Sequence, residues 1–206
     1  MTQVSQPSAE DIAYIRHLSE SGARAPLVGG RFMAWWGLLL VIAYVGQHLA
    51  VNRMIGDGNT IFGIVWGSFG LLGLIGQLLL ARTIGNKPGQ GSAGNLAMRA
   101  VWVSGAFAIG AMAVGSAIIS NPRMPGIRPW DFIVPVAFAA YACALGVTGV
   151  LAGSRVLKVA AALAVVMVGL FTALIQLPER YLIVSAGAAA TVLLPGLLLM
   201  RGEPKG

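Results

Sequence analysis

Long apolar stretches alternate with short polar segments along the chain after residue 31. A bilayer hydrocarbon core is about 30 Å thick, so a helix needs about 20 apolar residues to cross it. Six windows meet this requirement and contain no acidic residue: 32–51, 61–81, 100–119, 132–152, 156–176 and 181–200. The pattern predicts an all-α, polytopic integral membrane protein, a compact bundle of six transmembrane helices over residues 32–200.

Lysine and arginine are distributed unevenly between the segments that connect these windows. Alternate segments carry ten on one side: Arg16, Arg24, Arg31, Arg82, Lys87, Arg99, Arg155, Lys158, Arg201 and Lys205. The other side carries four: Arg53, Arg123, Arg128 and Arg180. Cytoplasmic segments are enriched in positive charge, so we expect the N-terminus and the tail 201–206 in the cytoplasm. The short connections and this bias fit a bacterial inner membrane.

The N-terminal segment 1–31 precedes the first window and is largely polar. Ser8 can cap a helix over residues 9–21. Its apolar residues Ile12, Ile15 and Leu18 fall on one face. We therefore expect a short cytoplasmic amphipathic helix. It either lies on the membrane or bundle surface or docks a protein partner through this face.

The composition supports a membrane protein. Charged residues make up only 10% of the chain, whereas a soluble domain carries about 25%. A net charge of +7 would suggest nucleic acid in a soluble protein, but no basic helix or aromatic-interleaved patch is present. Membrane topology accounts for the positive charge, and nucleic acid is not expected as a partner. The single cysteine, Cys143, lies in a predicted span, so an intramolecular disulfide is impossible.

Small residues recur at helical spacing in the predicted spans, which allows helix backbones to approach closely in lipid. Gly63, Gly67 and Gly70 share one face of the second span. Other pairs four residues apart are Ala106 and Gly110, Ala111 and Gly115, Ala142 and Gly146, and Gly149 and Gly153. We interpret these faces as packing within the chain. The alternative, strongest for the second span, is a homo-oligomer interface. Pro195 removes one helix hydrogen bond, which predicts a kink in the last span.

Residue types that support catalysis or metal binding are sparse. Residues 89–94 spell GxGxxG, but a dinucleotide site needs a strand before this motif and a helix after it. We interpret the motif as a flexible linker between spans. His17 and His48 fall on opposite sides of the membrane and cannot share a metal. No serine or cysteine has a histidine and a carboxylate at its depth. The sequence therefore predicts no catalytic residue, metal ligand or cofactor.

Polar residues inside the spans gather in their outer halves. This candidate cluster comprises Gln47, His48, Ser116, Thr172, Gln176 and Ser185. The proline-rich loop before Asp131 can cover it. Hydrogen bonding between helices is one interpretation, and a small polar cavity open to the outside is the other.

Three functions fit these features. We expect a non-catalytic, multi-pass inner-membrane protein that acts through protein partners as a sensor, regulator or assembly subunit. A small channel or carrier for a neutral solute, using the outer-facing polar cluster, is the alternative. The spans hold almost no ionisable residues that could couple transport to protons or ions, which counts against a pump or an acid-coupled carrier. A membrane-embedded cofactor protein or enzyme is the third hypothesis.

Overall fold

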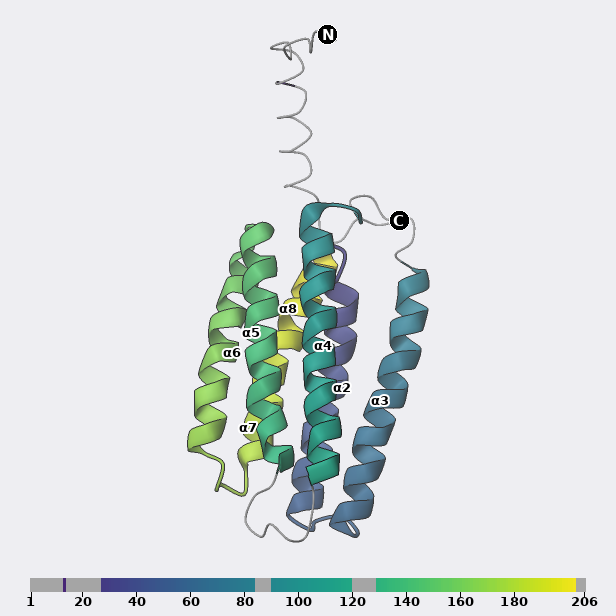
Figure 1. Cartoon of the computed structure of the whole chain (residues 1–206), viewed down its shortest axis with the longest axis vertical. Coiled ribbons are helices and arrows are strands. Elements are labelled where there is room, and N and C mark those ends of the chain that lie inside the picture. The colour runs from purple at the N-terminus through teal and green to yellow at the C-terminus, as the bar shows by residue number, and fades with distance from the viewer. Residues whose placement is uncertain (1–12, 14–26, 84–89, 120–128, 203–206) are drawn as a thin grey trace, which may run out of the picture.

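Every secondary-structure element in the described part of the chain is helical. The structure is a computed structural model that describes residue 13 and residues 27–83, 90–119 and 129–202. Figure 1 shows the elements in order: α2 (Gly30–Val51), α3 (Gly58–Arg82), α4 (Ala93–Ile119), η1 (Pro129–Phe132), α5 (Ile133–Leu151), α6 (Arg155–Ala173), α7 (Arg180–Ala188), η2 (Ala189–Leu193) and α8 (Leu194–Gly202). The face formed by Ile12, Ile15 and Leu18 lies outside the described residues, and so does residue range 120–128.

Six helical segments are long and apolar enough to cross a membrane, which confirms the all-α prediction with six such helices. The last of these is continuous from Arg180 to Gly202 and includes a π-helical turn, η2. This turn ends at Leu193, directly before α8 and two residues before Pro195. The kink predicted at Pro195 stays a prediction.

The observed helix boundaries differ from the predicted windows by up to seven residues, and two of these differences move residues that were singled out in the sequence. Helix α4 begins at Ala93, seven residues before the predicted window at residue 100, because the polar first turns of this helix have low hydropathy. The last two residues of the GxGxxG motif therefore belong to a helix and not to a linker. Helix α6 ends at Ala173, and Gln176 lies in the turn that follows. Pro178 has no backbone N–H and disfavours helical backbone at Leu177, so the helix does not continue past this turn.

Side-chain caps fix the starts of two helices. Asp57 accepts hydrogen bonds from the backbone nitrogen of Thr60 at 3.0 Å and from its hydroxyl at 2.9 Å. The backbone hydrogen bond, and after it the hydroxyl hydrogen bond, holds the pKa of Asp57 below its ordinary value. Ser154 caps α6 by accepting from the Leu157 nitrogen at 3.4 Å. Gly153, at φ +63°, provides the left-handed backbone of the turn between α5 and α6.

The core forms where α2, α5, α6 and α7 meet. Its largest fully buried side chains include Phe138 from α5 and Phe171 from α6, and Tyr44 and Val184 join them from α2 and α7. Helix α2 packs against α7, η2 and α8 on one side and against α3 on another. Helix α4 packs mainly against α5. Helices α3 and α4 therefore lie at the edge of the bundle, as Figure 1 shows for α3.

The two ends of the bundle differ in charge. We call the end where α2 begins and α8 ends the proximal end, and the opposite end the distal end (Figure 1). Six described basic residues lie toward the proximal end: Arg31, Arg82, Arg99, Arg155, Lys158 and Arg201. Two described basic residues, Arg53 and Arg180, lie toward the distal end. The alternating helix directions thus separate the charges as the connecting segments predicted.

Candidate functional site

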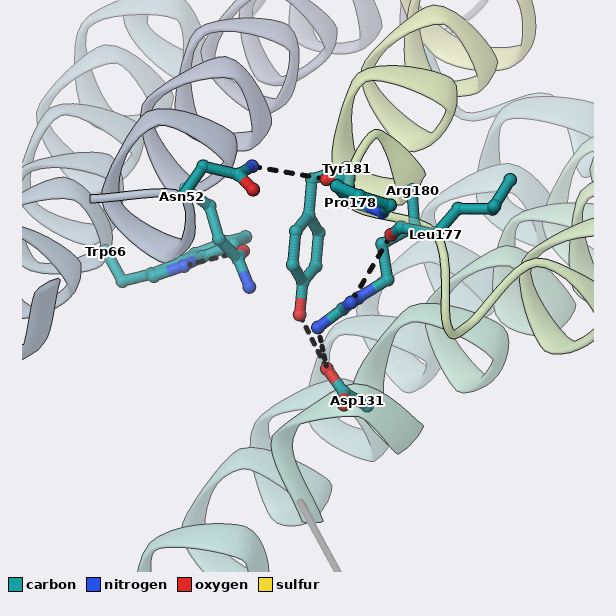
Figure 2. Close-up of polar contacts among 8 residues, drawn as sticks. Asn52, Trp66, Asp131, Leu177, Pro178, Arg180 and Tyr181 are labelled. Carbon is teal, nitrogen blue, oxygen red and sulfur yellow. Dashed lines mark hydrogen bonds and ion pairs between the residues drawn. The ribbon is translucent and has the colours of Figure 1, made fainter. Parts of the chain in front are cut away.

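A buried ionic network joins η1 to α7 at the distal end. The Tyr181 hydroxyl donates to Asp131 Oδ1 at 2.5 Å, and Arg180 Nη2 lies 4.0 Å from the same oxygen. Figure 2 shows the phenol and the guanidinium converging on this carboxylate. The side chains of Arg180 and Asp131 are only 10% and 12% exposed. A buried charge without a partner is energetically costly. Separating η1 from α7 would leave Asp131 and Arg180 in that state, so the pair favours contact between these two elements.

The turn between α6 and α7 orients Arg180. Its Nη1 donates to the Leu177 carbonyl at 3.4 Å, and its guanidinium carbon lies 4.8 Å from the centre of the Tyr181 ring. A guanidinium over an aromatic face is attracted by the ring electrons. The arginine is therefore held by three groups: the Asp131 carboxylate of η1, the Leu177 carbonyl of the α6–α7 turn and the aromatic face of Tyr181 in α7.

A second polar contact ties the end of α2 to the same turn. Asn52 Nδ2 donates to the His48 carbonyl at 2.9 Å and to the Pro178 carbonyl at 3.2 Å, the latter drawn in Figure 2. The Nδ1 atom of His48 lies 3.1 Å from the same amide nitrogen. The His48 ring thus lies beside the end of its own helix. Asn52 forms the hydrogen bond that joins this end to the turn before α7.

The residues of the predicted polar cluster do not share one environment. Gln47 accepts from Trp66 Nε1 at 3.1 Å, and the Ser185 hydroxyl donates to the Val41 carbonyl at 3.0 Å. Both bonds join α2 to a neighbouring helix. The Thr172 hydroxyl donates within its own helix, to Val168, and its side chain is exposed. Gln176 is exposed in the α6–α7 turn, and Ser116 is buried on α4.

Sequence reasoning missed Asp131, Arg180 and Asn52 as site residues. Asp131 directly precedes the fourth predicted window, and Arg180 directly precedes the sixth. Hydropathy alone therefore assigns both positions to loops. The available signal was a pair of opposite charges, Asp131 and Arg180, each directly before a predicted span that begins at the same end of the bundle.

The network is suited to holding helices together. The Asp131 oxygen that accepts the tyrosine hydrogen bond also faces Arg180, so this oxygen is committed to contacts inside the protein. Among the described residues, no three histidine, cysteine, aspartate or glutamate side chains are grouped so that they could hold a metal ion. Cys143 is exposed on α5. The arrangement is that of an interhelical clamp.

Glycine faces divide α3 into an inward and an outward side. An ideal Cβ placed on Gly73 would lie 2.2 Å from the Trp36 ring, and one on Gly76 would lie 2.1 Å from Trp35 Nε1. These two glycines let α3 approach α2. By contrast, Gly63, Gly67 and Gly70 have no heavy atom within 4 Å of such a Cβ. The outward face is therefore not used for packing among the described residues.

The other small-residue faces also divide into two kinds. In α5, a Cβ on Gly149 would lie 3.0 Å from Leu157 Cβ, and one on Gly146 would lie 3.8 Å from Ala161. This face packs within the chain against α6, as we predicted. In α4, Gly110 and Gly115 have open space around the same position. Gly110 and Gly115 of α4, like Gly63, Gly67 and Gly70 of α3, thus face away from the described core.

Comparisons of the chain with protein-family models, with curated proteins and with solved structures found no match.

Proposed function

We propose that the chain is an integral membrane protein with six transmembrane helices and both termini in the cytoplasm, in a bacterial inner membrane. Six helices of sufficient length and hydropathy support insertion. The excess of arginine and lysine toward the proximal end supports the orientation. Under this proposal the clamp of Asp131, Arg180 and Tyr181 lies near the outer surface.

We further propose that the protein is a non-catalytic subunit that acts through protein partners within the membrane. One observation carries this proposal. Only 6% of the most apolar window is buried in α3 and in α4, whereas the other four spanning segments are 33–44% buried. Edge helices with small-residue faces favour close approach of a further helix. The partner is a second copy, through Gly63, Gly67 and Gly70, or another membrane protein.

The N-terminal segment supplies a second docking element in this proposal. Its face of Ile12, Ile15 and Leu18 is apolar at helical spacing. A short helix of this kind can seat in a groove of a partner on the cytoplasmic side. The intramembrane and cytoplasmic contacts together suit a regulatory or assembly subunit.

Photo-crosslinking in native membranes tests the intramembrane contact. A photoreactive amino acid replaces Gly67 on the outward face of α3, and the control carries it at Val166 of α6. Val166 is 59% exposed, and its neighbours at helical spacing, Leu163 and Leu170, are exposed large apolar residues. We expect protein adducts at position 67 and only lipid adducts at position 166.

The size of the adduct at position 67 distinguishes the two kinds of partner. A band at twice the chain mass, containing only this chain, identifies a homo-oligomer. A different mass identifies another subunit, which mass spectrometry of the adduct can name. Adducts to lipid alone at both positions would overturn the proposal of an intramembrane partner.

A further inference from the structure

A groove lies between α6 and the C-terminal helical segment. Its volume is about 320 Å³. On one side it is lined by Arg155, Val156, Val159, Ala160 and Leu163 of α6, and on the other by Ala190, Leu194, Pro195 and Leu198. Every lining residue except Arg155 is apolar. The groove is separate from the open faces of α3 and α4.

The groove follows from local helix geometry. The small side chains of Ala160 and Ala190 line it from opposite sides. Next to them, the π-helical turn Ala189–Leu193 and Pro195 interrupt the regular α-helix. A π-helical turn widens a helix and frequently marks a functional site. Here it coincides with a hollow beside α6.

The rims of this groove are exposed. Val159 is 60% exposed and Leu163 is 42% exposed on α6, while Leu194 is 54% exposed on the opposite rim. These apolar side chains face outward, where a spanning helix meets lipid tails. A flexible hydrocarbon chain therefore matches the surroundings and the chemistry of the groove.

A cation marks one end of the groove. Arg155 is the first residue of α6, it is exposed, and no described carboxylate pairs with it. A guanidinium binds phosphate oxygens in a bidentate geometry. Basic residues between helices near the membrane surface are a recurrent site for anionic headgroups. The charge is thus complementary to a phosphate at the mouth of an apolar groove.

The length of the groove matches one membrane leaflet. Eight residues separate Arg155 from Leu163, so the α6 wall extends about 12 Å at 1.5 Å per residue. Half of a hydrocarbon core is about 15 Å. We propose that the groove holds one acyl chain of an anionic phospholipid, whose phosphate pairs with Arg155 at the proximal end. This proposal rests on the proposed membrane insertion and is independent of the proposed protein partner.

Lipid retention by the full-length protein tests the headgroup. Native mass spectrometry compares phosphatidylglycerol with phosphatidylcholine of the same acyl chains. We expect preferential retention of phosphatidylglycerol, which Arg155→Gln reduces about fivefold. Lys158→Gln is the matched control. It removes a charge three residues away on a side chain that does not line the groove and lies against Gly149 of α5. Equal losses in the two variants would overturn a specific site.

Mapping the acyl chain tests the groove in the unaltered protein. Phosphatidylglycerol with a diazirine in one acyl chain is photolysed in vesicles, and the modified residues are located by mass spectrometry. We expect adducts to concentrate on Val159, Leu163, Leu194 and Leu198. Arg155→Gln should reduce them about fivefold and leave adducts on the exposed face of α3 unchanged. An even distribution over all exposed helix faces would overturn the proposal.

Discussion

The contact between α3 and α2 depends on a glycine that leaves no room for a side chain. A Cβ at position 76 would lie 2.1 Å from Trp35 Nε1. Optimal contacts between such atoms are about 3.5 Å long, so the Gly76→Ala variant must move the indole by about 1.4 Å. The indole nitrogen now donates to the Leu72 carbonyl at 3.3 Å. A displacement of that size breaks this hydrogen bond.

The cost has two parts. Overpacking a close contact costs about 1–3 kcal/mol, and an interhelical hydrogen bond in a membrane protein contributes about 0.6 kcal/mol on average. Alanine also has a higher helix propensity than glycine by about 1 kcal/mol, which opposes the loss. The Gly70→Ala variant has the same gain in helix propensity, at a position where the added Cβ would have no heavy atom within 4 Å. We therefore expect Gly76→Ala to be about 1.5–3.5 kcal/mol less stable than Gly70→Ala.

Unfolding by denaturing detergent in mixed micelles measures this difference. Circular dichroism reports the helices, and protein dilution keeps each variant monomeric, so that any role of Gly70 in association does not contribute. In a Trp35→Ala background, Gly76→Ala should cost less than it does in the unaltered protein, because the obstructing ring is gone. If Gly76→Ala and Gly70→Ala unfold within about 0.5 kcal/mol of each other, α3 does not seat on Trp35 as described.

Two further predictions concern the distal end. Asp131→Asn removes the charged acceptor of Tyr181 and the partner of buried Arg180, so thermal unfolding should show a loss of about 1.5–3 kcal/mol; Tyr181→Phe should cost less, and full additivity in the double variant would contradict a shared network. The lowered pKa of Asp57 means that its cap contributes above the ordinary aspartate pKa of about 3.9 and is lost as pH falls through the folded-state value. Hydrogen exchange at the Thr60 amide, relative to mid-helix amides of α3, should therefore lose protection at acid pH. Asp57→Asn, which can cap without titrating, should remove this pH dependence, and an unchanged profile would contradict the assignment.

Hydropathy was sufficient to locate the six long helices. Each predicted window overlaps one observed helix, because a segment that faces lipid and other apolar helices is apolar throughout. The errors fall at helix ends. Buried Asn95, whose Oδ1 accepts from the Val28 nitrogen at 3.1 Å, belongs to α4 but has low hydropathy. Asp131 and Arg180 were excluded from the windows for the same reason, so the sequence did not predict the clamp that they form with Tyr181.

Helical spacing identified faces of small residues, but it could not identify their neighbours. Gly149 and Gly67 both occur in four-residue repeats, yet one contacts α6 and the other contacts nothing described. Gly73 and Gly76 are three residues apart and were not singled out, although both lie against indole rings. In a soluble helix the polar face indicates which side meets water. A lipid-facing side and a helix-facing side are both apolar, so this signal is absent in the spans.

Side-chain size is then the remaining indicator of helix contact, and it supports the partner proposal. An isolated face toward lipid gains nothing from glycine, which has a lower helix propensity than leucine and no side chain to pack against acyl chains. The exposed residues Ile64, Leu71 and Leu74 of α3 follow this rule. Gly63, Gly67 and Gly70 lie on the same helix but have no side chain, and an ideal Cβ on any of them would have no described heavy atom within 4 Å. Glycines at such positions stabilise the structure when another helix backbone approaches them closely. Photo-crosslinking at Gly67 therefore tests both the partner and the reason for the glycines.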